Sequence, residues 1–341
     1  MTTATPSGSR RRPTIEDVAQ AAGVSKGTVS RALNGKRWVS PMAQQAVERA
    51  VRKTGYRANA SAKALKSGRT RSVAFLLGDQ VGKMFADPNI PVLINGVSEA
   101  LAAEDMSMLL LLCATAEERR RAVEFVKAGH VDGVMLISWH LRDLSIIEDF
   151  NDLHVPVITC GRSEVVPAGS SCVSADDRAG GAEMTRYLMS LGRKRIVIIK
   201  GPPDSVGANE RYEGYVEALG GKVRKRDTAS GDWSKASGAA AMRRLLRSAP
   251  DLDAVFAGND AMAAGAIEVL QEAGRSVPRE VAVGGFDDSA SAVQCDPRLT
   301  TMRQPFDQIT RAMARLMTDL VDGHAPAQLV FRTTLVGRDS A

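Results

Sequence analysis

The sequence predicts two different folds in one chain: an all-α head built around a helix-turn-helix, and an α/β body made of two doubly wound parallel sheets. Two observations predict this arrangement. Residues 14–35 place apolar side chains at helical spacing on both sides of a glycine. From Arg71 onward, short apolar runs alternate with helical stretches, which is typical of parallel strands covered on both faces. The 341 residues are enough for two or three domains with sizeable cores.

The first helix of the head is expected to follow Thr14. Thr14 and Asp17 fit a capping box, in which each side chain bonds a free backbone amide of the first turn. Val18 and the other apolar residues of this stretch recur at helical spacing and make one face. Gly23 can end the helix because glycine adopts a positive φ without strain.

A second helix can begin at Ser25, whose hydroxyl is suited to a helix cap. This helix should carry Val29 and Leu33 inward and stop at Asn34 and Gly35. Because the turn is short, the two helices must cross and share one small core, which makes a helix-turn-helix. The second helix then presents outward Lys26, Gly27, Thr28, Ser30 and Arg31.

A third helix is predicted from Ser40 as a cap and Pro41 at the first position, with Gly55 at its end. The segment N59-A-S-A-K-A-L-K-S-G-R-T70 then offers a helix from Ser61 to Gly68 with little to pack against. So short a helix is marginal alone in water, and we expect it to form only when something docks on it. The expected division is a disordered basic tail in residues 1–12, the head in 13–58, this linker in 59–70 and the body in 71–341.

The charge is concentrated in the first part of the chain. Residues 1–71 contain fifteen Lys and Arg against three acidic residues, a net charge of +12, so the other 270 residues carry a net charge of −6. A basic head on an acidic body favours a polyanionic partner for the head, with a solvated surface as the less favoured alternative.

Nine apolar runs in the body are strand candidates, too many for one lobe and well suited to two. They are residues 73–78, 108–113, 133–138, 156–161, 172–176, 195–201, 254–260, 281–288 and 328–337. The first lobe is expected to comprise about 71–173 and 303–326, and the second about 174–302 and 327–341. Polar residues follow several of these runs, and ligands of such sheets bind beyond the carboxyl ends of the strands. Two facing polar rims predict a cleft for a small, hydroxyl-rich molecule.

Several other classes of function lack their signatures. The chain contains no phosphate-binding P-loop, no G-x-S-x-G and no H-E-x-x-H motif, and its four histidines form no cluster. The four cysteines lack metal-ligand spacing, and three lie in or beside apolar runs, which suggests a reducing cytoplasm. Neither a signal peptide nor a membrane-spanning run is present. We therefore expect that the protein is not an enzyme and that it has no cofactor, metal or membrane partner. Its expected location is the cytoplasm, in association with the nucleoid. A secreted binding protein is the remaining minor alternative.

From Pro13 onward, over about 95% of its length, the chain resembles the lac repressor (LacI/GalR) family of transcriptional regulators. The motif T14-I-E-D-V-A-Q-A-A-G-V-S-K-G-T-V-S-R-A-L-N34 and the 59–70 linker are highly specific for it. The body adds V131-D-G-V, R211-Y-E-G-Y, F256-A-G-N-D-A-M-A-A-G, V283-G-G-F-D-D and L299-T-T-M-R-Q-P. The resemblance implies a helix-turn-helix head, a hinge helix, and a two-lobed core like that of a periplasmic sugar-binding protein. It also implies a homodimer or tetramer that binds a pseudo-palindromic operator.

On the DNA side, the resemblance implies base reading by Lys26, Gly27 and Arg31, and the donors of Lys and Arg suit guanine in the major groove. Leu65 resembles the hinge leucine that inserts into the minor groove, with a contact between two hinge helices as the alternative. Phosphate and backbone contacts are implied for Thr14, Ser25, Thr28, Ser30, Asn34 and Tyr56, and further linker contacts for Asn59, Ala62 and Lys66.

On the ligand side, the resemblance implies that Arg211 grips sugar hydroxyls with its guanidinium, with a salt bridge between the lobes as the alternative. Trp233 would offer a stacking plane, and Asn259 and Asp287 would bond ligand hydroxyls, while Asp260 would cap a helix. Trp139, His140 and Arg162 complete the expected pocket.

One departure from the family is the long segment after the first strand, residues 78–97, with its D87-P-N-I-P stretch. This stretch and the run H130-V-D-G-V-M-L-I-S-W-H resemble a branch of actinobacterial regulators that respond to cellobiose and other oligosaccharides. A di- or oligosaccharide is therefore the expected effector. A purine, an amino-sugar phosphate, and a corepressor that strengthens DNA binding remain open alternatives.

Overall fold

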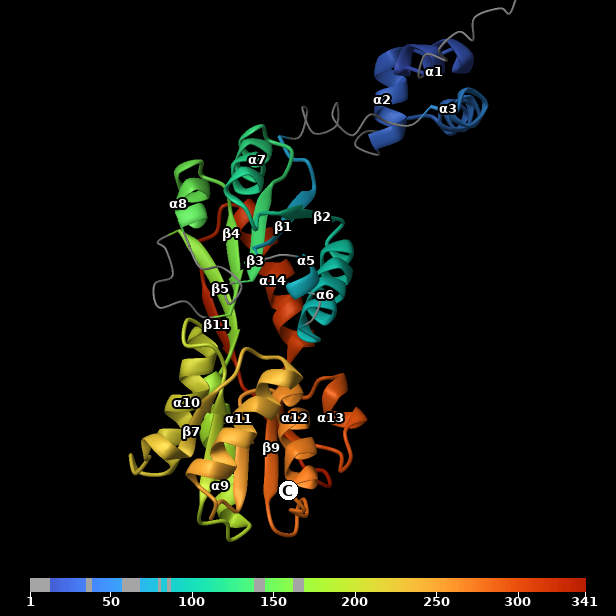
Figure 1. The fold of residues 1–341 in the computed structure, drawn as a ribbon. Coiled ribbons are helices and arrows are strands. Elements are labelled where there is room, and N and C mark those ends of the chain that lie inside the picture. The colour runs from blue at the N-terminus through green and yellow to red at the C-terminus, as the bar shows by residue number, and fades with distance from the viewer. Residues whose placement is uncertain are drawn as a thin grey trace, which may run out of the picture. The chain divides into compact units, whose positions relative to one another are not determined.

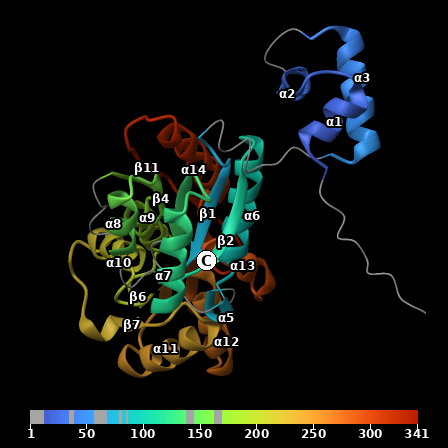
Figure 2. The ribbon, with the colours of Figure 1, turned by 90° about the horizontal axis from the view of Figure 1, so that it is seen from above.

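The computed structural model describes residues 13–34, 39–56, 68–78, 81–84, 87–137, 145–161 and 169–341. The chain divides into two compact units between Thr70 and Arg71, which we call the head and the body. Figure 1 shows both units, and Figure 2 shows them from above.

The head has three helices in the described ranges: α1 (Ile15–Ala22), α2 (Lys26–Asn34) and α3 (Pro41–Thr54). The capping box of α1 is confirmed: the Asp17 carboxylate accepts the backbone amide of Thr14 at 2.6 Å, and Thr14 Oγ1 accepts the amide of Asp17 at 3.4 Å. Gly23 follows at φ 68°, and Gly55 ends α3 with the same φ. These signals are short-range, so the sequence alone locates the helix boundaries.

One small core holds the three helices together. It is formed by the buried residues Val18, Ala19, Val29, Val47 and Ala50. The prediction that Leu33 points inward is wrong, because its side chain is 40% exposed. Ala32, one residue earlier, packs against the core from the end of α2 in its place.

The first lobe of the body is an α/β sandwich around a six-stranded sheet in the order β11-β5-β4-β3-β1-β2, with every neighbouring pair parallel. Helices α6 and α14 bury one face of the sheet and α7 and α8 the other. The elements are β1 (Ser72–Leu77), α5 (Val81–Met84), α6 (Asn89–Ala103), β2 (Ser107–Leu112), α7 (Ala116–Lys127), β3 (Gly133–Ile137), α8 (Ser145–Asp152), β4 (Val157–Cys160), β5 (Ser170–Ala175), α14 (Phe306–Val321) and β11 (Gln328–Phe331).

The second lobe repeats this plan with the order β12-β10-β9-β8-β6-β7, in which only the β10–β12 pair is antiparallel. Helices α9 and α10 bury one face and α11 and α12 the other. The elements are α9 (Asp177–Ser190), β6 (Ile196–Lys200), α10 (Val206–Ala218), the 3₁₀ turn η2 (Lys225–Asp227), β7 (Thr228–Ser230), α11 (Lys235–Ser248), β8 (Ala254–Ala257), α12 (Asp260–Glu272), β9 (Ala282–Asp287), α13 (Ala290–Gln294), β10 (Thr300–Arg303) and β12 (Thr334–Val336).

The predicted class, a helical head and two doubly wound sheets, is confirmed, but three details of the body differ. Strands β7 and β10 were not predicted, since one has three residues and the other reads T-T-M-R, without an apolar run. The expected single strand at 328–337 divides into β11 and β12, which belong to different sheets. The expected lobe boundaries are corrected accordingly, because residues 174–175 and 328–331 lie in the first sheet. The chain therefore crosses between the lobes three times: after β5, after β10 and after β11.

The cysteines in the described part of the body are thiols, and most of them are buried. Cys113, Cys160 and Cys172 are buried and Cys295 is half-buried, and none of the four forms a disulfide. Burial raises the pKa of the Cys113 thiol to about 11, which keeps it protonated. Among the described residues, no helix is long and apolar enough to cross a membrane.

Close packing of α9 against α10 depends on two glycines. A Cβ on Gly214 would lie 2.0 Å from the carbonyl oxygen of Arg178, and one on Gly181 would lie 2.3 Å from the carbonyl oxygen of Arg211. Backbone atoms cannot give way as flexible side chains do. Gly214→Ala is therefore expected to lower the free energy of unfolding by about 1–3 kcal/mol or more in urea titrations. Gly337→Ala, where an added Cβ would meet nothing within 4 Å, is the matched control and should be near neutral.

Candidate functional site

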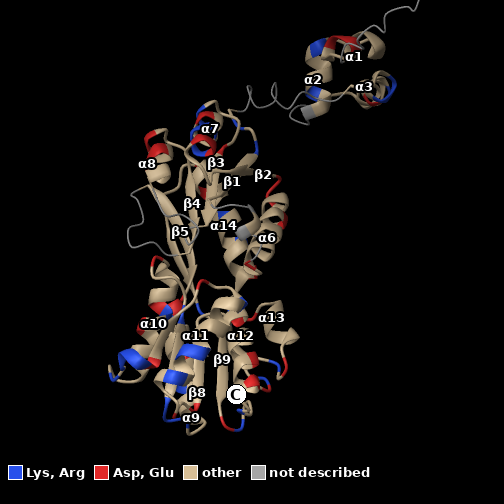
Figure 3. Cartoon of the chain, in the orientation of Figure 1, with Lys and Arg blue, Asp and Glu red and all other residues tan. Residues whose placement is uncertain are grey.

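The outward face of α2 in the head carries the cations that the sequence predicted. Lys26, Gly27 and Arg31 are exposed, and Thr28 and Ser30 are half-buried. Figure 3 shows basic residues on α2 and acidic residues on α1. The ammonium group of Lys26 forms an ion pair with Glu16, and Arg31 donates to Thr28 Oγ1 at 3.3 Å. Both cations stay accessible, because exposed pairs of this kind are weak.

Other residues predicted to contact DNA have structural roles in the head. Thr14 caps α1, and the Ser25 hydroxyl accepts the amide of Thr28 at 3.1 Å. Tyr56 is half-buried against the head core. The fold itself does not require glycine at position 27, since the nearest atom to an added Cβ would be Ser25 Oγ at 3.6 Å. The side chain of Asn34, and the residues Asn59, Ala62, Leu65 and Lys66, lie outside the described residues.

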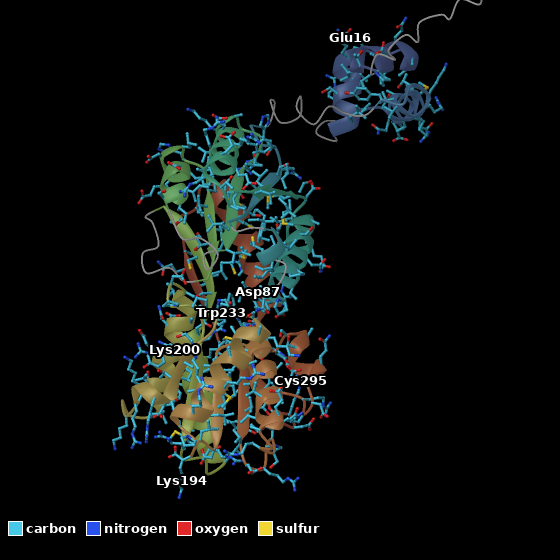
Figure 4. All side chains as sticks on the ribbon, in the orientation of Figure 1. Glu16, Asp87, Lys194, Lys200, Trp233 and Cys295 are labelled. Atoms are coloured by element: carbon cyan, nitrogen blue, oxygen red, sulfur yellow. The ribbon has the colours of Figure 1, made fainter. Side chains whose placement is uncertain are left out.

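A cavity that is partly open to solvent lies between the two lobes of the body, and the space inside it, open solvent included, is about 630 Å³. Figure 4 labels Asp87 and Trp233, two of the residues that line it. Four of the predicted ligand residues line it, namely Arg211, Trp233, Asn259 and Asp287. The other three, Trp139, His140 and Arg162, lie outside the described residues.

Arg211, on α10, is the central cation of this cavity. Its Nε donates to Asp177 Oδ1 at 2.7 Å, and one terminal nitrogen donates to the carbonyl oxygen of Gly258 at 2.5 Å and lies 3.3 Å from Asp287 Oδ1. Its guanidinium carbon also lies 3.8 Å from the centre of the Phe286 ring. Burial acts to lower the pKa of Arg211, but the charges of the Asp177 and Asp287 carboxylates outweigh this effect, so the pKa is raised. All of these partners belong to the second lobe, so Arg211 does not bridge the lobes.

Asp287, at the end of β9, makes the contact between the lobes that was considered for Arg211. Its Oδ2 accepts from Nδ2 of Asn89, in the first lobe, at 2.8 Å, and its Oδ1 accepts from Nε2 of Gln304 at 2.7 Å. Its backbone has φ 111°, a region that non-glycine residues rarely adopt and that clusters at functional sites. Burial raises the pKa of Asp287 to about 6, and the Arg211 guanidinium opposes this rise.

Trp233 and Asn259, both in the second lobe, are joined by a hydrogen bond. Asn259 Nδ2 donates to the carbonyl oxygen of Trp233 at 3.0 Å, and Asn259 Oδ1 accepts the amide of Met262 at 2.9 Å. The indole packs so closely on Gly201 that an added Cβ there would lie 2.2 Å from it. Asn259 therefore caps α12 and fixes Trp233, with both ends of its amide engaged inside the protein.

The expectation that Asp260 caps α12 is wrong. Asp260 is fully buried and accepts from Thr301 Oγ1 at 2.5 Å and from the amide of Ser289 at 2.6 Å. Burial, followed by the neighbouring Asp287, raises its pKa well above the usual range. Adjacent Asn and Asp residues are both good caps, and only the tertiary contacts decide between them.

Sequence reasoning missed six polar residues that line the cavity: Asp87, Asn89, Ser174, Asp177, Ser205 and Gln304. The only available signal for Asn89 was its place in the unusual D87-P-N-I-P stretch. Within the described ranges, three carboxylates and one guanidinium line the cavity, those of Asp87, Asp177, Asp287 and Arg211. In the same ranges no group of three His, Cys, Asp or Glu residues is placed to hold a metal ion. The lining thus suits a neutral ligand with both donors and acceptors, and disfavours an added phosphate group.

The fold and the site together define a class of protein: a helix-turn-helix DNA-binding unit joined to a two-lobed body with an interlobe cavity is a transcriptional regulator. Residues 14–59 match the model of bacterial regulatory proteins of the lacI family, and residues 185–341 match that of the periplasmic binding protein-like domain. The chain belongs to the lacI family of bacterial transcriptional regulators. The relatives that it matches are regulators, not enzymes.

Relatives and solved structures agree over nearly the whole chain. It is 41% identical to the HTH-type transcriptional regulator CelR of Thermobifida fusca, over 97% of this chain and 99% of that protein. It is 32% identical to the regulator AscG of Escherichia coli, over 96% and 98% of the two chains. The structure of a CelR–cellobiose complex aligns with TM-score 0.75 at 40% identity, covering 97% of this chain and 100% of that one. The lac repressor dimer bound to operator and the anti-inducer ONPF aligns with TM-score 0.84 at 25% identity, covering 97% and 99%.

Proposed function

We propose that this protein represses genes of carbohydrate uptake or utilisation, and that a neutral di- or oligosaccharide in the interlobe cavity releases it from a pseudo-palindromic operator. The observation that carries the proposal is the cavity itself. It combines an indole wall with carboxylate and amide groups around a buried arginine, which are the groups that a sugar ring and its hydroxyls require. The relative CelR, solved as a complex with cellobiose, makes a β-linked glucose disaccharide the first ligand to test.

On the DNA side, we assign base reading to Lys26 and Arg31 and close approach of the backbone to Gly27. Gly27 supports this assignment because an added Cβ would make only ordinary contacts within the described head, at 3.6 Å from Ser25 Oγ and 3.9 Å from Arg31, so the fold does not require glycine there. Leu65, in the linker, is the proposed minor-groove wedge. The lac repressor, solved as a dimer on its operator, supports a homodimer that binds operator DNA.

A panel titration tests the ligand. Cellobiose and other mono- and disaccharides, a nucleobase and a sugar phosphate are each added to the full-length protein, and the melting temperature is recorded. We expect a neutral disaccharide to raise it, because a ligand that binds only the folded state stabilises that state by mass action.

The same compounds are then added to the protein bound to promoter DNA from beside its own gene, with fluorescence anisotropy as the readout. The stabilising sugar should release the DNA, and glucose is the matched control for a disaccharide. Stabilisation by the phosphate or the nucleobase, with no response to any sugar, would contradict the saccharide proposal.

A further inference from the structure

Asn89 connects the two lobes across the wall of the cavity. Its hydrogen bond to Asp287, 2.8 Å long, joins residues 198 positions apart in the chain. Asn89 is 7% exposed and Asp287 is 4% exposed, so the bond is shielded from water. It also engages the carboxylate that was expected to receive a ligand hydroxyl.

The D87-P-N-I-P stretch fixes the position of Asn89 at the start of α6. Asp87 Oδ1 accepts the backbone amide of Asn89 at 2.9 Å, and the carbonyl oxygen of Asp87 accepts the amide of Ile90 at 3.2 Å. Pro88 between them has φ −63°, as proline requires. The unusual segment after the first strand thus positions the carboxamide of Asn89 at the interlobe cavity.

Of the donors that surround Asp287, Asn89 is the one that can be replaced. Arg211 is held by a second carboxylate and a backbone carbonyl of its own lobe. Gln304 is fixed by its backbone, whose amide donates to the carbonyl oxygen of Asp287 at 3.3 Å. In the described part of the chain the Asn89 side chain makes only the bond to Asp287. It belongs to the other lobe, and three crossing segments are the only covalent connections between the lobes.

We propose that the Asn89 carboxamide and a ligand hydroxyl compete for one donor position on Asp287, and that the ligand binds by replacing Asn89 there. This rests on the proposed function, since it requires a hydroxyl-bearing ligand in the cavity. A buried carboxylate needs donors in every state of the protein, because an unpaired buried charge is costly. Asn89 supplies one such donor, and a ligand that replaces it must break this bond, which lowers the ligand affinity.

Removal of this donor tests the exchange. In Asn89→Ala, one oxygen of Asp287 lacks its donor until a ligand hydroxyl arrives, so ligand binding should become tighter by about three- to tenfold. Calorimetric titration of full-length protein with cellobiose as the probe gives the dissociation constants. Asn95→Ala is the matched control, because Asn95 lies on the same helix and its side chain bonds Glu99 on the exposed surface; its affinity should equal that of the wild type.

A second measurement needs no ligand. Hydrogen–deuterium exchange of the full-length proteins should be faster in Asn89→Ala than in the wild type or Asn95→Ala, in peptides covering residues 87–93 and 284–288. Unchanged exchange there would overturn the interlobe bond, and unchanged or weaker cellobiose binding by Asn89→Ala would overturn the replacement. Failure of the wild type to bind any sugar would instead contradict the proposed function, and the exchange comparison would still decide whether Asn89 holds the lobes together.

Discussion

The Arg211→Ala variant is expected to lose about 3–5 kcal/mol of its free energy of unfolding, the usual cost of removing one partner from a buried ion pair. Arg211 is 8% exposed and lies between Asp177 and Asp287, which are 7% and 4% exposed. Without the guanidinium, two buried carboxylates face each other with no cation between them, and the carbonyl of Gly258 loses its donor. Burial already raises the pKa of Asp287 to about 6, and Arg211 opposes that rise.

Urea titrations of full-length protein followed by circular dichroism measure this loss. Arg243→Ala is the control: Arg243 pairs with Glu272 at 3.0 Å, but both side chains are more than half exposed. Such surface pairs contribute about 0–1 kcal/mol, so this variant should unfold nearly as the wild type does. If Arg211→Ala were equally stable, the arginine would not be the cation that neutralises the cavity.

This result changes how a ligand role of Arg211 can be tested. If Arg211→Ala lost its response to the ligand, the cause could be either unfolding of the protein or loss of a ligand contact. Arg211→Lys keeps the positive charge between the carboxylates but lacks the planar fork that bonds two acceptors at once. The lysine variant is therefore the one to compare with the wild type in ligand titrations, after its stability has been measured.

Local signals predicted the head almost completely. The capping box at Thr14, the cap at Ser40 and the left-handed glycines at 23 and 55 act within one helical turn, so the sequence carries them without any knowledge of the fold. Leu33 is the exception. Helical spacing placed it inward, but its exposure depends on how far the core of the head extends along α2.

The body was predictable as a pattern and less so in detail. Buried strands such as β3 and β6 were found because every residue in them is apolar or nearly so. Between β11 and β12 the run at 328–337 has only Arg332 and Thr333. No glycine or proline marks the crossing between the lobes there, and so the run reads as one strand. The sequence cannot show that Asn89 meets Asp287, because this pairing depends on two separately folded lobes coming together. Four of the seven predicted ligand residues line the cavity, yet Asn259 uses its side chain to cap a helix.

The affinity of the full chain for DNA is expected to fall about 10³–10⁵-fold between about 50 mM and about 200 mM salt, the range for a protein that neutralises about 6–10 phosphates. The cause is the charge distribution: residues 1–71 carry a net charge of +12, while the rest of the chain carries −6. Bound phosphates release their counterions, and added salt opposes that release. Fluorescence anisotropy with operator and unrelated DNA over a salt series gives both slopes.

The variant Arg31→Ala distinguishes sequence-specific binding to the operator from general binding to DNA. Arg31 is exposed on α2, where its guanidinium can bond a guanine edge, so its removal should weaken operator binding by about 1–3 kcal/mol and affect unrelated DNA much less. A fragment of residues 71–341 begins at the boundary between the two compact units and lacks the basic head. It should bind neither DNA, and should still be stabilised by the ligand. Base contacts distinguish one DNA sequence from another at the same phosphate charge. Equal losses on both DNAs in Arg31→Ala would therefore show that α2 does not read the bases. Operator binding by the 71–341 fragment would lead to the same conclusion.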